Sequence, residues 1–272
     1  MLLGVHCSVS GGVINAFNEV RKLGLDTFQI FTKNQRQWKE KIFEEKEAND
    51  FKEALKKSEI KKAFSHSSYL INLASCEEPI RKNSILALAG ELLRCDALGL
   101  NYTVLHPGAC KELGEAEGIR LVSEALSLVL NTTKDLSVKI LLENTAGQGS
   151  SLGWKFEHHE EIIDRVGSDR LGLCLDTCHA FAAGFDIRTK AGFEDMIANI
   201  DKPVGLKKLY AFHLNDSKGD LGSRIDRHDG IGNGKIGIVP FREIMHHFKQ
   251  TPKVLELPPE MNEKSLEVLR GL

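Results

Sequence analysis

The chain has 272 residues, of which 42% are hydrophobic and 27% are charged, and its formal net charge is -2. This composition is typical of a globular protein with a substantial core. It excludes a protein that binds nucleic acid or a membrane through an overall positive field, so a polyanionic partner must meet positive charge that is gathered locally.

The start of the chain shows no targeting signal. Met1–Val5 is apolar but too short for a signal peptide, and no later apolar run approaches the length of a membrane span. The six cysteines are scattered, as is typical of reduced and mostly buried thiols. Cys174 and Cys178 are the only close pair, and they lack the second pair of a zinc knuckle. We expect a cytoplasmic protein that is not associated with a membrane.

Eight short apolar runs along the chain predict buried β-strands. Between them, apolar residues recur every three or four positions, as in helices with one buried face. Eight alternations in 272 residues average 34 residues each, which fits a strand, a helix and two loops. No linker divides the chain, so we predict an α/β fold with a single (β/α)8 TIM-barrel domain over residues 1–272. The expected strands are Leu2–Val5, Thr27–Phe31, Lys62–Phe64, Tyr102–Leu105, Lys139–Leu142, Leu171–Leu175, Leu209–Leu214 and Lys253–Leu257.

Side chains that can bind metals stand at the carboxyl ends of six successive predicted strands. A closed barrel gathers these ends at one mouth, where enzymes with this fold hold their active sites. The set contains no thiolate, and its mixture of imidazoles and carboxylates suits zinc or manganese. We therefore expect a metal site at the carboxyl-terminal face. The six residues are His66, His106, Glu143, Asp176, His213 and Glu256.

A second group of ligand-type residues lies in the predicted loops. His179 follows the sixth strand, and Asp226 and His228 follow the seventh. Asp226 and His228 straddle Arg227, so their side chains can point the same way in an extended segment. Together the three would form a site that leaves one position open for water or substrate, as a catalytic zinc requires.

Other polar features near the mouth have several interpretations. His6 ends the first predicted strand, where it either supports the metal site or packs in the core. The glycine-rich segment 230–237 matches no nucleotide-binding fingerprint, and we expect a flexible loop that folds over the mouth. The pairs His158–His159 and His246–His247 fall in predicted helices and are expected to be solvated or to cap those helices.

Assembled in this order, the residues resemble the endonuclease IV family of zinc-dependent apurinic/apyrimidinic endonucleases. The resemblance covers essentially the whole chain, and a set of long motifs in the same order is very specific. The sequence departs from the family at Ser67, where an acidic residue is common, and after Glu256, where Leu257 replaces an expected threonine. The motifs are Phe31–Trp38, His66–Asn72, Leu105–Gly108, Glu143–Gly149, Leu175–Phe181, His213–Lys218 and Ser223–His228.

The resemblance implies three zinc ions per chain, with manganese as an alternative at some positions. Glu143 would bridge two of the metals, and Glu143 and Glu256 are the residues we expect to be catalytic. The first zinc would be bound by His66, His106 and Glu143, the second by Glu143, Asp176, His213 and Glu256, and the third by His179, Asp226 and His228.

The implied function is DNA repair. The enzyme would hydrolyse the phosphodiester 5′ to an abasic site in duplex DNA, leaving a 3′-hydroxyl and a 5′-deoxyribose phosphate, and would also remove 3′-blocking groups. A metal-bound hydroxide would attack the phosphorus. Arg36, Tyr69 and Leu70 are suited to entering the base stack, and we expect a monomer whose partner is damaged DNA. Basic residues of the βα loops that can contact phosphates are Lys33, Arg36, Lys155, Lys218, Arg224 and Arg227.

Two other classes of function compete with this interpretation. A sugar isomerase of the xylose-isomerase type uses a similar barrel but needs only two metals, which would leave His179, Asp226 and His228 without a role. A non-catalytic binder of damaged DNA would hold structural zinc, but structural sites are closed and rich in thiolates. The metal content per chain separates the isomerase, with two, from the endonuclease, with three.

Overall fold

Eight parallel strands form a closed barrel in this computed structural model, which describes residues 2–272. The hydrogen-bonded order is β1-β10-β7-β6-β5-β4-β3-β2, and a bridge between His6 and Gln29 joins the two ends of the sheet. The TIM-barrel prediction is therefore confirmed, and all eight predicted strands are present. The barrel strands are β1 Leu3–Val5, β2 Thr27–Ile30, β3 Lys62–His66, β4 Tyr102–Leu105, β5 Lys139–Glu143, β6 Leu171–Asp176, β7 Leu209–His213 and β10 Lys253–Leu255.

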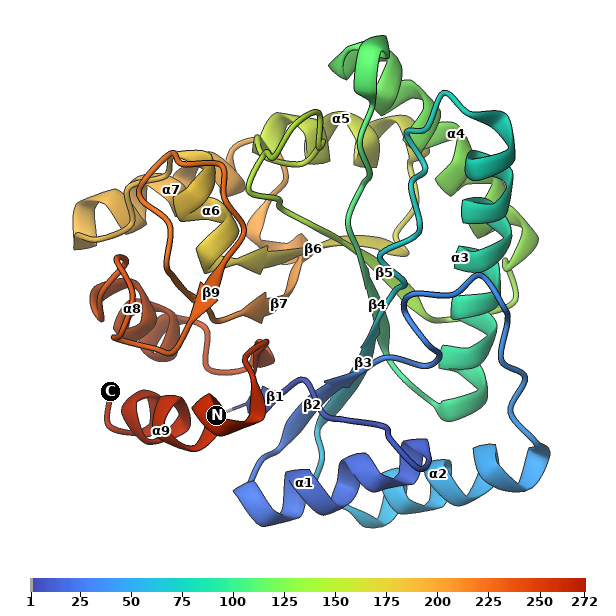
Figure 1. Ribbon diagram of the computed structural model, residues 1–272, viewed down its shortest axis with the longest axis horizontal. Helices are drawn as coiled ribbons and strands as arrows, with labels where there is room; N and C mark the ends of the chain where they lie inside the picture. The colour runs from blue at the N-terminus through green and yellow to red at the C-terminus, as the bar shows by residue number, and fades with distance from the viewer. Residues whose placement is uncertain (1) are drawn as a thin grey trace.

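Helices surround the barrel and cover the outer faces of its strands, as Figure 1 shows. Their apolar faces pack on the apolar outer side chains of the strands in one continuous hydrophobic core. Among residues 2–272, no helix combines the length and the apolarity needed to cross a membrane. The α-helices are α1 Ala16–Leu23, α2 Glu45–Lys57, α3 Glu78–Leu98, α4 Glu115–Thr132, α5 Phe156–Val166, α6 Thr177–Ala183, α7 Lys190–Asp201, α8 Val239–His247 and α9 Pro259–Arg270, and the 3-10 turns are Val13–Asn15, Lys111–Leu113 and Leu206–Lys208.

The inside of the barrel carries a layer of apolar side chains that forms the floor of the mouth. In six strands, the residue of this layer lies two positions before one of the predicted metal ligands. Side chains two residues apart point to the same side of a strand, so the ligands form the next layer above this floor. The pairs are Phe64 and His66, Val104 and His106, Leu141 and Glu143, Cys174 and Asp176, Ala211 and His213, and Val254 and Glu256.

The loop after β7 contains a small antiparallel hairpin of two-residue strands, β8 Asp216–Ser217 and β9 His228–Asp229. The carboxylate of Asp216 is fully buried and accepts hydrogen bonds from the backbone N–H groups of Gly232, Gly234 and Ile236. The glycine-rich segment is thus fastened to β8 by these three hydrogen bonds.

Candidate metal centre

The predicted ligands from the six strand ends converge around the carboxylate of Glu143. Its Oε2 lies 3.2 Å from His66 Nε2 and 3.0 Å from His106 Nε2, and its Oε1 lies 2.9 Å from His213 Nδ1. The same Nδ1 of His213 is 3.1 Å from Glu256 Oε2. Two clusters therefore share Glu143, and within each cluster the ligand atoms lie within 4.8 Å of one another: His66, His106 and Glu143, and Glu143, Asp176, His213 and Glu256.

The loop residues form a third cluster beside this pair. Asp226 bridges two imidazoles, since its Oδ2 is 3.1 Å from His179 Nε2 and its Oδ1 is 3.2 Å from His228 Nε2. His179 lies in the first turn of α6 and not in a loop as expected, because Asp176 caps that helix by accepting the backbone N–H of His179 at 2.8 Å. The ligand atoms of His179, Asp226 and His228 again lie within 4.8 Å of one another.

A fourth combination of nearby groups includes the thiol of Cys178 together with Asp176 and His228. Burial raises the pKa of Cys178 to about 12, so the thiol stays protonated at neutral pH. A thiol must lose its proton to bind a metal well, and this combination is therefore weaker than the three above.

The centre carries four carboxylates, from Glu143, Asp176, Asp226 and Glu256. Among residues 2–272, their ion-pair partners are all histidines, and no lysine or arginine joins them. Burial alone would raise the pKa of Glu143, but the neighbouring histidines lower that pKa well below its usual range. Burial likewise opposes the charge of His228, yet Asp176 and Asp226 raise its pKa to about 9. The four carboxylates thus stabilise positive charge at the centre, whether on protonated imidazoles or on a divalent cation.

The ring orientations of the histidines also suit a metal. The Nδ1 atoms of His66, His179 and His228 lie 2.8, 2.9 and 3.2 Å from backbone carbonyl oxygens, to which they can donate. Their Nε2 atoms are then left as acceptors that face carboxylate oxygens. In particular, His228 Nε2 is buried without a hydrogen-bond partner. A metal cation could take the place of a proton between this nitrogen and the carboxylates, so the residues fit a metal.

His213 is oriented the opposite way by a residue that the sequence analysis missed. Gln29 of β2 is fully buried, and its Oε1 lies 2.8 Å from His213 Nε2, which leaves Nδ1 to face Glu143 and Glu256. The amide nitrogen of Gln29 donates to Glu256 Oε1 at 2.6 Å and lies 2.9 Å from His6 Nδ1. His6 therefore contacts the site through Gln29. This contact favours a supporting role for His6 over simple packing in the core. The available signal for Gln29 was a lone amide inside an otherwise apolar strand.

Asparagine side chains support the neighbouring carboxylate in a similar way. Asn215 donates to Asp176 Oδ2 at 2.6 Å and accepts the backbone N–H of Glu256 at 2.9 Å. Asn144 bonds both backbone groups of Asp176, at 2.7 and 3.0 Å. The departure at Ser67 has little consequence for His66, because the backbone carbonyl of Ser67 accepts from the imidazole.

The buried pair on α5 was also assigned wrongly from the sequence. His158 and His159 are buried and not solvated, since both face inward from α5. The Nδ1 atom of His158 accepts the backbone N–H of Gly153 at 3.0 Å. Burial lowers the pKa of His159 to about 4, so this ring is neutral at physiological pH. The pair supports the loop that follows β5.

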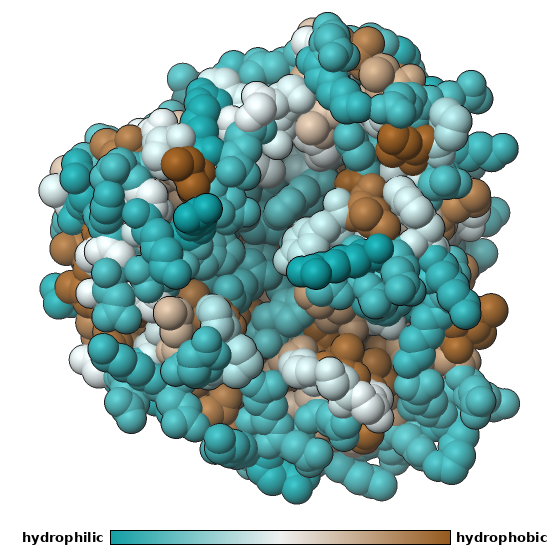
Figure 2. All heavy atoms as spheres, in the orientation of Figure 1, coloured by the Kyte–Doolittle hydropathy of each residue, from teal (hydrophilic) through white to brown (hydrophobic). Residues whose placement is uncertain are grey.

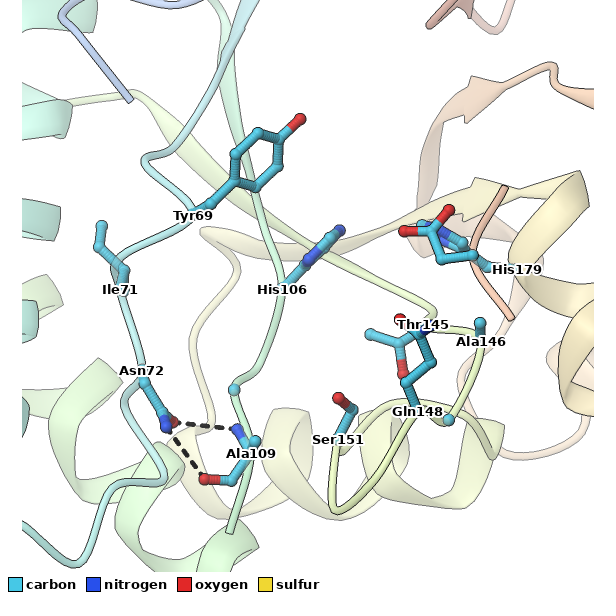
Figure 3. Close-up of a pocket in the computed structure, with 13 residues that line it drawn as sticks. Tyr69, Ile71, Asn72, His106, Ala109, Thr145, Ala146, Gln148, Ser151 and His179 are labelled. Carbon is cyan, nitrogen blue, oxygen red and sulfur yellow. Dashed lines mark hydrogen bonds and ion pairs between the residues drawn. The ribbon is translucent and has the colours of Figure 1, made fainter. Parts of the chain in front are cut away.

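An open cavity of about 220 Å³ adjoins the metal ligands at the barrel mouth. Figure 2 shows this face of the molecule hollowed at its centre, with mostly hydrophilic residues around the hollow. In Figure 3, Tyr69, His106 and His179 surround one end of the cavity, and Asn72, Ala109 and Ser151 lie at the other. Tyr69 is 58% exposed, and the centroid of its ring lies 5.2 Å from that of His66. Tyr69 thus stands on the rim directly above a predicted ligand.

The other predicted DNA contacts differ in their environments. Arg36 and Arg227 are exposed, and Leu70 is half-buried. Lys33 is buried instead, and its ammonium group is enclosed by backbone carbonyls of its own loop. An ammonium in this position cannot reach a phosphate, so the environment of Lys33 does not fit a direct contact with DNA.

Three further basic residues were expected on the rim. Lys155 pairs with Glu115 at 2.9 Å, and the guanidinium of Arg224 stacks 4.1 Å above the ring of Trp154. Lys218 is exposed and borders a second cavity, beside Arg227. Lys218 and Arg227 are therefore the basic side chains of this loop that remain available to a ligand.

Comparisons with known proteins identify the family of the chain. Residues 17–272 match the sequence family described as xylose isomerase-like TIM barrel. A relative named probable endonuclease 4 from Geobacter sp. (strain M21) is 43% identical, covering 100% of this chain and 98% of its own. Another of that name, from Chloroflexus aurantiacus (strain ATCC 29366 / DSM 635 / J-10-fl), is 44% identical, covering 94% of this chain and 90% of its own.

Solved structures give the same picture. Endonuclease IV from Thermus thermophilus superposes with a TM-score of 0.89 at 34% identity, covering 100% of this chain and 98% of its own. A D-tagatose 3-epimerase-like protein shares the fold at a TM-score of 0.78, but at only 22% identity, covering 100% of this chain and 96% of its own.

Proposed function

Because this chain belongs to the endonuclease IV family of xylose isomerase-like TIM barrels, we propose that it hydrolyses the phosphodiester 5′ to abasic sites in duplex DNA. The products would be a 3′-hydroxyl and a 5′-deoxyribose phosphate, and removal of 3′-blocking groups would be a related activity. We further propose that the enzyme acts in the cytoplasm as a monomer.

Three zinc ions are the metals we propose, with manganese as an alternative at some positions. Glu143 would bridge the metal held with His66 and His106 and the metal held with Asp176, His213 and Glu256. His179, Asp226 and His228 would hold the third. Bound metal ions supply positive charge that polarises a phosphodiester and stabilises the charge that develops as it is cleaved.

The observation that carries this proposal is the third cluster. A sugar isomerase of the same fold needs two metals and has no use for a cluster beside them. Here Asp226 lies between His179 and His228 at 3.1 and 3.2 Å, directly adjoining the cavity. A site that extends along the cavity suits an anionic substrate, such as a phosphodiester with its charge shared between two oxygens, better than an uncharged sugar.

The protein's own residues would position the damaged strand. We propose that Tyr69, Leu70 and Arg36 enter the base stack and hold it kinked, while Arg227 contacts a backbone phosphate. An abasic nucleotide has no base to unstack or unpair, so moving it toward the metal centre costs less than moving a normal nucleotide. The preference for abasic sites would follow from this difference.

A test is to incubate the purified protein with a duplex that contains one abasic site. The expected result is a single nick 5′ to the site, three metal ions per chain, and loss of cleavage after chelation. A matched duplex without the lesion is the control. Two metals per chain together with sugar isomerisation and no nick would instead support the isomerase.

The role of the rim can be tested separately. Replacing Tyr69, Leu70 and Arg36 by alanine should reduce cleavage of the abasic duplex much more than hydrolysis of a small phosphodiester, which requires no bending. Equal losses on both substrates would show that these residues only support the metal centre.

A further inference from the structure

The loop that carries Arg36 is folded around a buried ammonium group. The side chain of Lys33 is 3% exposed, and its Nζ donates to the backbone carbonyl oxygens of Gln37, Trp38 and Lys39 at 2.9, 3.3 and 3.4 Å. The same Nζ lies 3.0 Å from Glu40 Oε1. An ammonium group has three donors and no acceptor, and here the loop supplies all of its partners.

Glu40 connects this ammonium to a second buried cation on α3. The other oxygen of Glu40 accepts from Arg94, which also donates to Thr32 Oγ1 and Glu91 Oε2, each at 2.8 Å. Arg94 and Glu91 are only 4% and 1% exposed. Two cations and two carboxylates thus alternate in one network, which we call the Lys33 network: Lys33, Glu40, Arg94 and Glu91.

The network reaches both the metal centre and the rim. Glu91 Oε1 accepts from Ser65 Oγ at 2.6 Å, and Ser65 directly precedes His66 on β3. On the rim, Ser68 Oγ donates to the carbonyl of Gln35 at 2.8 Å, next to Arg36. The loop of Arg36 is therefore tied to the strand that ends in a predicted metal ligand.

Lys33, Glu91 and Arg94 are buried, whereas the side chain of Glu40 is 40% exposed. Burying charged groups is costly, so the three buried ones persist only while each is paired. The network therefore permits few arrangements of the loop, although loops of this length are ordinarily mobile. A loop that is ordered before it binds loses less conformational entropy on binding. The exposed side chain of Arg36 would therefore bind with a smaller loss of conformational entropy.

We propose that the Lys33 network is a positioning device that holds Arg36 at a fixed place relative to the metal centre. Lys33 would act on DNA through the shape of its loop and not by touching a phosphate. The network would affect cleavage of a duplex but not of a small phosphodiester. This inference rests on the proposed function, because it assigns the network to the recognition of duplex DNA.

The main test is Lys33→Met, which keeps the length of the side chain and removes its charge. Lys39→Met is the matched control, because Lys39 has the same charge, lies in the same loop and has an exposed side chain. For Lys33→Met we expect kcat/KM on an abasic duplex to fall by about 10- to 100-fold, as a small misplacement of a positioning group does. Hydrolysis of bis(4-nitrophenyl) phosphate and the metal content should stay at the wild-type level.

The salt dependence of DNA binding distinguishes positioning from direct contact. Each phosphate contact contributes about 0.9 to the slope of log K against log salt concentration. If Lys33 only shapes its loop, the slope for Lys33→Met should equal that of the wild type. A slope that is flatter by about 0.9, or equal losses on both substrates, would overturn the proposal.

A second variant disturbs the network from outside. A Cβ at Gly90, in the middle of α3, would lie 2.6 Å from Glu40 Oε2, so Gly90→Ala should displace the Glu40 carboxylate. We expect a smaller loss on the duplex in the same direction, without a lower melting temperature, because alanine favours a helix. If Lys33→Met fails to fold, Gly90→Ala serves as the test of whether the network positions Arg36. Full duplex activity in Gly90→Ala would then overturn the proposal.

Hydrogen exchange keeps the result independent of the proposed function. Amides of residues 34–39 should exchange faster in Lys33→Met than in Lys39→Met in the absence of DNA. Equal exchange would show that the network does not order the loop. A wild-type protein that orders the loop but does not nick an abasic duplex would remove the proposed function, and with it the role in DNA recognition.

Discussion

The candidate metal centre has an inner part, the two clusters that share Glu143, and an outer part, the cluster with Asp226. Different structural elements hold these two parts in place. The inner part uses strand ends, and Glu143, Asp176 and His213 are fully buried there. The outer part takes Asp226 and His228 from the loop after β7, where their side chains are 37% and 18% exposed. Strand ends are fixed by the barrel, whereas a loop has fewer contacts to hold it. The inner part is therefore formed by the fold itself, and the outer part would depend more on the metal.

The supporting hydrogen bonds differ in the same way. In the inner part, side-chain amides of Gln29 and Asn215 bind the ligands His213, Glu256 and Asp176 directly, whereas His66 contacts a backbone carbonyl, that of Ser67. In the outer part, the supporting partners of the imidazoles are backbone carbonyls. A side-chain amide can be removed by mutation without breaking the chain, so the two parts can be tested separately.

The largest effect is expected at Glu143, the residue common to both inner clusters. Glu143→Gln removes a charge that faces four imidazoles, so we expect kcat on the abasic duplex to fall by at least about 1,000-fold, which corresponds to about 4 kcal/mol. DNA affinity should change little. Glu260→Gln, at an exposed glutamate, is the control. Turnover near the wild-type level in Glu143→Gln would disprove the bridging role.

A smaller but selective loss is expected in the outer part. His228→Ala should remove about one metal ion per chain and lower cleavage by about 100-fold, or about 2.7 kcal/mol, because the strands do not depend on this residue. Metal analysis and circular dichroism measure the two quantities, and His247→Ala, at an exposed histidine, is the control. An unfolded variant at room temperature would mean that the outer cluster is structural, and the distinction drawn above would fail.

The support of the inner part is tested at Gln29. Gln29→Leu keeps the approximate size of the side chain but removes the hydrogen bonds to His213 and Glu256. Loss of such a partner typically lowers metal affinity by about 10- to 100-fold, and competition with a chelator measures it. The outer cluster should keep its metal, as it does not contact Gln29. Unchanged metal affinity would show that the strands alone orient the ligands.

Much of this arrangement was predictable from the sequence, because it follows from the regular spacing of apolar residues in strands and helices. Apolar runs and helical spacing indicated the barrel, and the alternation of side chains placed Glu143, Asp176 and His213 in one layer. Strand ends of a closed barrel must meet, so ligands far apart in sequence could be brought together without knowing any distance.

The rest depends on contacts that leave no periodic signal. Gln29 and Asn215 are ordinary polar residues until a strand or loop brings them to a ligand. Lys33 resembled a phosphate contact because it stands beside Arg36 in a basic loop, but its burial depends on how the loop turns back on itself. His158 was placed on the wrong side of α5 for a related reason, since a polar face and a buried polar pair look alike in sequence.

The smallest expected effect is the change in local stability of the loop after β7 when the metals are removed. Without them, the inner carboxylates remain held by the strands, but the segment 226–229 keeps mainly the two-residue ladder between β8 and β9 and the contact of His228 Nδ1 with the carbonyl of Glu256. We expect its amides to exchange about 10-fold faster in chelated protein, which is about 1.4 kcal/mol of local stability, while amides of β5, β6 and β7 keep their protection. Chelated His228→Ala is the control, because it has already lost the outer metal and should show a smaller change. If chelation loosened the strands and the hairpin equally, the inner part would depend on metal as much as the outer, and the two parts would not differ in foundation.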